Sequence, residues 1–192
     1  EPCGVIVAEG PGMRRFHTGD RVIVYHISGC GMCHDCRKGY YISCSSPLRA
    51  AYGWQRNGGM APYMLCDEKD LVALPDELSY ADGAQVACGF GTVYEAIEKV
   101  GVSGNDTVLV TGLGPVGLAV LMLAKAMGAT KTIGVELSDY RIDLAKKLGL
   151  ADVILKPDDQ ALETIHSLTG GFGVERAFDT SANDQARQLA IR

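Results

Sequence analysis

The sequence lacks long apolar runs, a basic excess and low-complexity tracts, and each absence argues against a class of protein. No stretch approaches the roughly 18 consecutive apolar residues of a membrane-spanning helix, so no membrane span is predicted. Aspartate and glutamate (23) outnumber lysine and arginine (18), and there is no basic run, which argues against a dedicated nucleic-acid binder. The 24 glycines are scattered between short apolar runs and indicate many tight turns.

The cysteines are the most informative residues present. Cys30, Cys33, Cys36 and Cys44 are separated by two, two and seven residues. Thiolates at such spacing can converge on one tetrahedral metal, and zinc with four sulfur ligands has no open position, so it braces a loop and does no chemistry. We expect a structural zinc here.

Two alternatives to zinc are weaker but remain open. Closely spaced thiols are poorly placed for three disulfides, and seven cysteines leave one unpaired. Iron–sulfur runs of the ferredoxin type have a shorter last gap with proline after the final cysteine, whereas Ser45 follows here. Zinc thiolates also imply a reducing compartment, so a cytoplasmic location is expected.

The first half of the chain has short β-branched runs with frequent turns, which predict a compact β-rich domain. The expected strands are Val5–Val7, Arg21–Tyr25, Met64–Cys66 and Leu71–Leu74. A helix over Ser79–Lys99, broken near Cys88–Gly91, follows.

From Thr107 onward the pattern alternates between strand and helix. The expected strands are Thr107–Thr111, Lys131–Glu136, Asp152–Leu155 and Val174–Asp179, and the expected helices are Pro115–Met127, Asp139–Leu148 and Ala161–Leu168. Such an order predicts a parallel sheet with helices on both faces. Since a complete doubly wound sheet usually has two more strands, and the chain stops within an expected helix, we expect a fragment of a longer protein.

A glycine-rich loop connects the first strand and helix of this region. Gly112, Gly114 and Gly117 fit the Gly-x-Gly-x-x-Gly pattern, with Pro115 and Val116 opening the helix. The pattern alone is weak, but a preceding strand and a following helix are its confirming context. The glycines permit the tight turn and close backbone approach, so that a pyrophosphate can bind at the helix N-terminus.

The acidic partner of a dinucleotide loop is also in place. Glu136 ends the second expected strand, where its carboxylate can accept hydrogen bonds from ribose hydroxyls and would repel a 2′-phosphate. This favours NAD over NADP, although a solvated strand end is the alternative for Glu136. Arg141 is equally consistent with flanking the adenine and with an exposed helix charge.

Together these motifs resemble the zinc-dependent medium-chain alcohol dehydrogenases, and the resemblance covers essentially the whole chain. The matching segments are Glu1–Ile6, Gly19–Val22, Gly58–Tyr63 (with Pro62 in place of the usual glutamate) and Cys88–Thr92. The resemblance implies a partial β-rich GroES-like catalytic domain at 1–103 and a partial, doubly wound Rossmann domain that binds NAD at 104–192, together an α/β protein.

The same resemblance assigns roles to residues. It implies a catalytic zinc held by Cys88 and by a cysteine and a histidine that precede Glu1 in the family, with Glu1 as an acidic neighbour. Thr92 would lie against the nicotinamide, and Thr180 would line the cofactor cleft. Without the resemblance, Cys88 would be read as a buried, inert thiol.

The implied reaction is reversible oxidation of a secondary alcohol or polyol, with hydride transfer between the substrate and NAD. The implied partners are a small-molecule alcohol or ketone and further copies of the chain in a dimer or tetramer. Two alternatives remain: a truncated, inactive module that binds zinc and dinucleotide, and a quinone-reductase-like relative, against which the cysteines argue.

Overall fold

The computed structural model describes all residues 1–192 and contains two compact units, Glu1–Gly91 and Thr92–Arg192. The sequence-based division at 103/104 remains a prediction, because it concerns functional domains, whereas the two units reflect chain contacts. No helix has the length and apolar character needed to cross a membrane.

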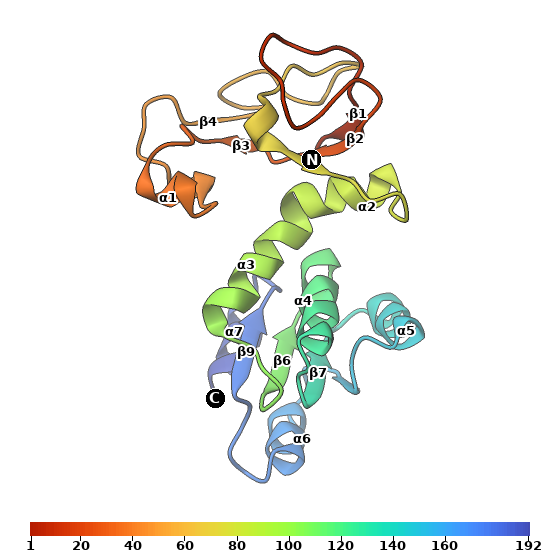
Figure 1. The fold of residues 1–192 in the computed structure, drawn as a ribbon. Coiled ribbons are helices and arrows are strands. Elements are labelled where there is room, and N and C mark those ends of the chain that lie inside the picture. Colours follow the sequence, from red (N-terminus) through yellow and green to blue (C-terminus); the bar gives the residue numbers. More distant parts are fainter. The chain divides into compact units, whose positions relative to one another are not determined.

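The first unit is built from two small antiparallel sheets (Figure 1). One has the strand order β1-β2-β5, formed by β1 (Cys3–Val5), β2 (Arg21–Val24) and β5 (Leu71–Ala73). The other pairs β3 (Ile27–Ser28) with β4 (Ala50–Ala51). The short helical segments are α1 (His34–Arg37), η1 (Tyr41–Ser43) and η2 (Glu68–Asp70).

Packing in the first unit is modest. Phe16, Val22, Val24, Tyr52 and Leu71 form one buried cluster, with Cys66 packed against it. Such small clusters stabilise by burying apolar area, at about 25 cal/mol per Å². Because this cluster is small, hydrogen bonds and ion pairs such as those of Asp67 and Asp70 also hold the segments between the strands.

A long helical stretch follows β5. It comprises α2 (Tyr80–Gln85), a π-helical turn η3 (Val86–Phe90) and α3 (Gly91–Val100). A capping box between Ser79 and Asp82 begins it. The expected helix is confirmed, and the expected break near Cys88 is a π turn, a feature that is frequent at functional sites.

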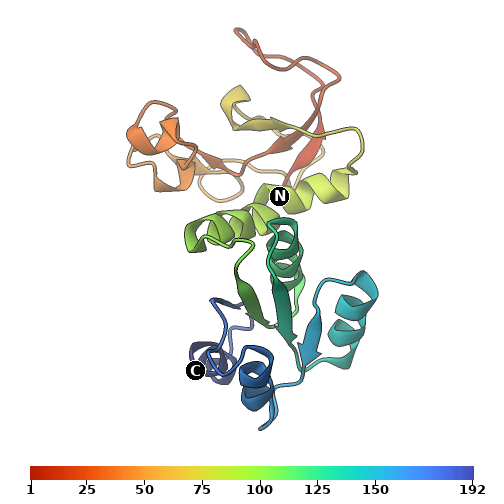
Figure 2. The same cartoon turned by 60° about the horizontal axis from the view of Figure 1, so that its bottom comes forward.

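The second unit contains one parallel sheet with the strand order β8-β7-β6-β9 (Figures 1 and 2). Its strands are β6 (Thr107–Thr111), β7 (Lys131–Val135), β8 (Val153–Leu155) and β9 (Arg176–Asp179). Its further helices are α4 (Pro115–Ala126), α5 (Asp139–Leu148), α6 (Ala161–Leu168) and α7 (Asp184–Ile191). The predicted alternation is confirmed, with bounds that agree to within two residues.

Alternation along the strands produces two apolar faces. Leu109 and Ile133 face one side, where Ile165 of α6 and Leu189 of α7 pack against them. The neighbouring residues of β6, including the fully buried Val110, face the other side, and α4 packs on β6 and β7. Burial on both faces explains why these strands are continuous apolar runs.

Two strand predictions in the first unit need correction. Met64–Cys66 forms no strand, and Leu65 is 83% exposed, because no other strand pairs with this segment. The first strand is Cys3–Val5 and not Val5–Val7, since its register with β2 pairs Cys3 with Ile23 and Val5 with Arg21.

Candidate metal centre and dinucleotide site

The four clustered cysteines converge in the structure. The sulfur atoms of Cys30, Cys33, Cys36 and Cys44 all lie within 4.8 Å of one another. The Sγ atoms of Cys30 and Cys36 are 4.0 Å apart, close to the roughly 3.8 Å edge of a tetrahedron with zinc–sulfur bonds of about 2.3 Å. None of the seven cysteines forms a disulfide, so the donor set and its spacing fit zinc.

Backbone amides orient two of these sulfurs. The N–H groups of Met32 and Cys33 donate to Cys30 Sγ at 3.4 and 3.3 Å, and Cys30 N–H donates to Cys44 Sγ at 3.4 Å. The two bonds from Met32 and Cys33 lower the pKa of the Cys30 thiol to about 6, and the bond from Cys30 leads those that lower the pKa of Cys44. These bonds therefore favour the thiolate form, which binds metal, at Cys30 and Cys44.

Burial acts in the opposite direction at Cys36. Removal from water raises the pKa of its thiol to about 12 without a metal.

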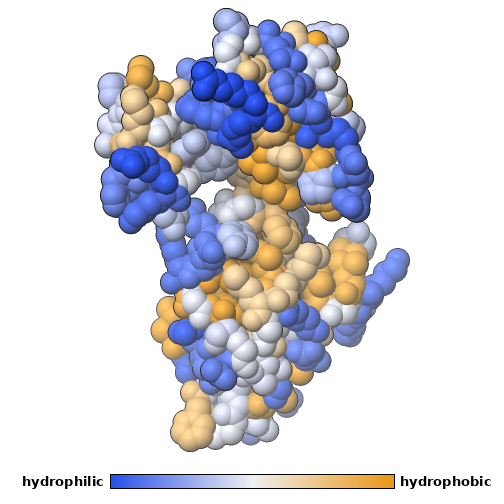
Figure 3. Space-filling model, in the orientation of Figure 1, coloured by the Kyte–Doolittle hydropathy of each residue, from blue (hydrophilic) through white to orange (hydrophobic).

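Gly29 must be glycine here, because an added Cβ would lie 2.6 Å from Cys36 Sγ. In Figure 3 the surface over α1 is hydrophilic, which agrees with the exposed His34 and Arg37 on this helix.

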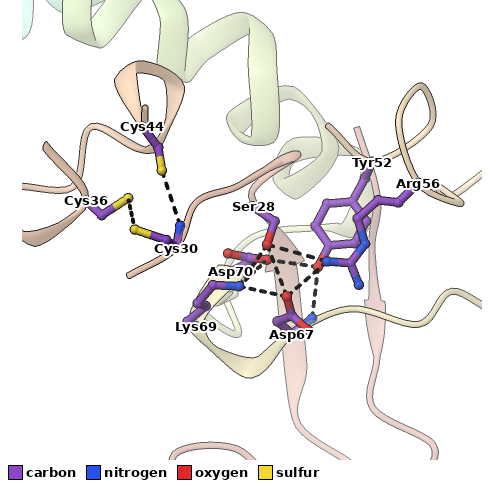
Figure 4. A network of polar contacts seen from close by, with 9 residues as sticks. All are labelled: Ser28, Cys30, Cys36, Cys44, Tyr52, Arg56, Asp67, Lys69 and Asp70. Atoms are coloured by element: carbon purple, nitrogen blue, oxygen red, sulfur yellow. Dashed lines mark hydrogen bonds and ion pairs between the residues drawn. The ribbon is translucent and has the colours of Figure 1, made fainter. Parts of the chain in front are cut away.

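A polar network lies beside the cysteine loop (Figure 4). Lys69 Nζ donates to Ser28 Oγ at 2.8 Å and to Asp67 Oδ2 at 2.7 Å, and Arg56 donates to the same Asp67 oxygen at 3.0 Å. The Lys69 bond, followed by that of Arg56, lowers the pKa of Asp67 to about 2. Ser28 precedes Gly29, so the network holds the start of the loop.

Asp70 is the buried centre of this network, with its side chain 0% exposed. Its Oδ2 atom accepts from the Tyr52 hydroxyl at 2.8 Å, and that hydroxyl accepts from Asp67 N–H at 2.9 Å. Burial raises the pKa of Tyr52, so the phenol remains a donor. Sequence analysis missed this network because its partners are separated by up to 41 residues and carry no motif.

The glycine loop has the geometry that a dinucleotide requires. Gly112 has φ +85°, and an added Cβ would lie 2.8 Å from Ser181 Cα. A Cβ on Gly117 would collide with Gly112 O, so the start of α4 packs directly on the turn. At Gly114 an added Cβ would meet no atom within 4 Å, which leaves space for a ligand at the N-terminus of α4.

Glu136, directly after β7, faces this loop and is only 7% exposed. Its Oε2 atom accepts from Leu113 N–H at 2.7 Å, and its Oε1 atom accepts from Leu137 and Ser138 N–H at 2.8 and 2.9 Å. These amides outweigh burial and lower the pKa of Glu136, and Arg141 lies 3.6 Å away. The carboxylate is thus ionised. Its Oε1 atom already accepts from two amides, whereas Oε2 accepts from one and has lone-pair capacity left for a ribose hydroxyl.

The loop after β9 approaches the glycines from the other side. Thr180 Oγ1 donates to Gly112 O at 2.7 Å, and Asp179 Oδ1 accepts from the hydroxyls of Thr111 and Ser181. Ala182 has φ +55°, an unfavourable value for a residue with a Cβ. The family resemblance implied that Thr180 lines the cofactor cleft, which stays a prediction, and it did not include the bond to Gly112.

The remaining predicted site residues, Cys88, Glu1 and Thr92, do not form a ligand cluster in this structure. Cys88 is half-buried on the π turn, where the preceding carbonyl, that of Ala87, lies 3.2 Å from His26 Nδ1. Glu1 is exposed in the first unit, and Thr92 is exposed on α3. The four clustered cysteines form the one group of three or more metal-binding side chains in residues 1–192, so Cys88 has no such group around it.

Two family descriptions match the chain. The alcohol dehydrogenase GroES-like domain matches residues 1–76, and the zinc-binding dehydrogenase family matches residues 115–192. The first includes the cysteine loop, and the second begins within the glycine loop.

Individual proteins agree with these matches. The chain is 53% identical over 193 residues to the uncharacterized zinc-type alcohol dehydrogenase-like protein YphC of Escherichia coli strain K12, covering 100% of this chain and 54% of that protein. It is 36% identical to D-arabitol-phosphate dehydrogenase of Enterococcus avium, covering 94% and 51%. The crystal structure of an NAD-dependent alcohol dehydrogenase superposes with a TM-score of 0.81 at 31% identity, covering 91% and 51%. The chain thus spans about half the length of the curated relatives it matches.

Proposed function

This chain belongs to the zinc-dependent medium-chain alcohol dehydrogenase family, and from that premise we propose that the protein transfers a hydride between a secondary alcohol or polyol and NAD. One observation carries the proposal: the same chain contains a four-sulfur metal cradle and a glycine loop backed by an ionised carboxylate. Relatives named as dehydrogenases of sorbitol and D-arabitol phosphate support a polyol-like substrate.

The residues of the second unit would hold the dinucleotide. When bound, NAD supplies the hydride acceptor. The open space at Gly114 and the free amides at the start of α4 would receive the pyrophosphate. Glu136 would accept from the ribose and, because its carboxylate is ionised, would disfavour a 2′-phosphate. Arg141 and Thr92 are proposed as further contacts, to the adenosine and the nicotinamide.

Zinc is proposed in two roles. The cradle of Cys30, Cys33, Cys36 and Cys44 fits a structural zinc, which would brace the loop around it. Cys88 is proposed as one ligand of a catalytic zinc, with Glu1 as its acidic neighbour. Because residues 1–192 do not form a second complete ligand set, we assign no chemical step to Cys88.

A direct assay tests the proposal. Purified protein is mixed with NAD or NADP and a panel of linear polyols and secondary alcohols, and reduced nicotinamide is followed by absorbance. We expect turnover with NAD and a kcat/KM for NADP that is at least about tenfold lower. Glu136→Gln should reduce this difference in kcat/KM between NAD and NADP. Turnover with NADP alone, or no turnover with either cofactor in zinc-loaded protein, would contradict the proposal.

One alternative is supported by a specific observation. Since only one complete metal-ligand group occurs in residues 1–192, this chain by itself fits an inactive module that binds zinc and dinucleotide. NAD binding with one zinc per chain and no turnover would favour this alternative. The cysteine cradle argues against a quinone-reductase-like relative.

Assembly and location are proposals of the same kind. We propose a homo-oligomer, a dimer or tetramer, on the basis of the family resemblance. A cytoplasmic location is proposed because free thiols in a metal cradle persist in a reducing compartment. Mass photometry would test the first proposal, and cell fractionation the second.

A further inference from the structure

We propose that Thr180 is a positioning residue for the dinucleotide, acting as one half of a clamp whose other half is Glu136. The clamp fixes a single peptide unit, the one between Gly112 and Leu113. This inference rests on the proposed use of NAD and adds a second role for Glu136.

Both polar groups of that peptide unit are held by side chains. Its carbonyl, Gly112 O, accepts from Thr180 Oγ1 at 2.7 Å. Its amide, Leu113 N–H, donates to Glu136 Oε2 at 2.7 Å. The two side chains follow β9 and β7, which flank β6 on opposite sides in the sheet. The peptide at the end of β6 is therefore gripped from both neighbouring strands.

A clamp is needed at this position because glycine does not fix its own backbone. Gly112 adopts φ +85°, and a residue without Cβ populates many other conformations at little cost. Rotation of the following peptide would exchange its carbonyl and amide directions. Since Gly114 and Pro115 come immediately afterwards, that rotation would also move the amides at the start of α4 that receive the pyrophosphate.

The Thr180 hydroxyl is itself held in place. Thr180 N–H donates to Thr111 O at 2.9 Å, which attaches the residue to the end of β6. The neighbouring Asp179 carboxylate accepts from Thr111 Oγ1 at 2.8 Å and from Ser181 Oγ at 2.6 Å. The Leu113 side chain is buried and packs directly on Gly134 of β7. A Cβ added to Gly134 would lie 3.0 Å from it. The other anchor, Glu136, is held by the N–H groups of Leu137 and Ser138, which donate to its Oε1 atom, so both side chains of the clamp are fixed before any ligand binds.

The test compares three variants of the full protein. Thr180→Val removes the hydroxyl at nearly constant volume, and Thr180→Ser keeps it. Thr130→Val is the matched control, because Thr130 Oγ1 also donates to a carbonyl, Gly104 O, at 2.7 Å, but in the loop before β7. NADH affinity is measured by fluorescence titration, and exchange of the Leu113 amide is measured by NMR without cofactor.

We expect Thr180→Val to raise the NADH Kd and the NAD KM by about threefold to tenfold with kcat unchanged, because it removes a hydroxyl that donates to Gly112 O at 2.7 Å and also lies 3.1 Å from Thr111 O. Exchange of the Leu113 amide should accelerate in the same variant, while Thr180→Ser and Thr130→Val behave as wild type. Wild-type affinity in Thr180→Val, or equal weakening in Thr130→Val, would overturn the inference. If the wild type bound no NADH, the proposed function would fail, and unchanged Leu113 exchange would then separately overturn the clamp.

Discussion

The two units of this chain reach order by different means. The second unit is a regular parallel sheet whose central strands are buried on both faces by apolar side chains. The first has short strands and long irregular segments, and its cysteine loop brings four sulfurs together beside a buried polar network. Apolar packing therefore orders the sheet that carries the dinucleotide site, whereas cysteine side chains and charged hydrogen bonds surround the metal site.

The two units should also differ in how strongly a single substitution affects them. Hydrophobic burial is non-directional and spread over many residues, so a sheet core loses stability by degrees. A metal cradle depends on four atoms, and loss of one disables it. We expect the two units to respond differently to the changes below.

Removal of one sulfur should have the largest effect. Cys44→Ser should abolish zinc binding and with it the metal contribution, on the order of 10 kcal/mol for structural zinc at neutral pH. The measurement is hydrogen exchange by mass spectrometry, in which amides of residues 30–44 should lose protection while those of β6 and β7 keep it.

Cys66→Ser is the control for this variant, because Cys66 packs against the small core of the first unit and lies outside the cradle. It should retain zinc. Full zinc content in Cys44→Ser, or an equal loss of protection in β6 and β7, would contradict the contrast between the units.

Truncation of the sheet core should be second in size. Leu109 is 2% exposed at the centre of the second unit, so Leu109→Ala should destabilise it by about 2–5 kcal/mol. Urea unfolding measures the loss, and added zinc should not restore it. Val72→Ala, on the half-exposed face of β5, is the control and should cost less. A loss below about 1 kcal/mol in Leu109→Ala would show that the core is not what orders this unit.

The smallest effect should be a difference in acid stability. The pKa of Asp67 is lowered to about 2 in the folded state, chiefly by Lys69 and then by Arg56. A lowered folded pKa stabilises above the ordinary pKa, about 3.9, and this stabilisation is lost as pH falls from about 4 to 2. Asp67→Asn should therefore be less stable than wild type at neutral pH, by an amount that shrinks over this window.

The Asp67 side chain is 46% exposed, so solvent screening keeps this difference small. Wild type and variant both lose zinc as acid protonates the thiolates, and only the difference between them is informative. Asp76→Asn, at a carboxylate that is 96% exposed, is the control. If the difference in free energy of unfolding between wild type and Asp67→Asn did not change with pH, the proposed role of Asp67 in the network would be wrong.

The sequence predicted the secondary structure of the second unit better than that of the first. Strands and helices of the second unit were predicted to within two residues, because their periodicity is local and their burial is continuous. The segment Met64–Cys66 was wrongly predicted as a strand, since its apolar letters give no information on whether a partner strand exists.

The candidate sites show the same limit. The cysteine cradle was predictable because all four ligands lie within one short segment. The bond of Glu136 to Leu113 and that of Thr180 to Gly112 join residues 23 and 68 positions apart, and only the order of strands in the sheet brings them together. Motif spacing identified both residues but not what they contact.

The zinc content of the chain is the decisive measurement for the four-sulfur cradle. Native mass spectrometry of reduced, freshly purified residues 1–192 measures it as a mass increment per chain. The four-sulfur cradle predicts one zinc per chain, lost in Cys44→Ser and retained in Cys66→Ser. No zinc in the wild-type chain, or full zinc retention in Cys44→Ser, would contradict the assignment of the cradle as a zinc site.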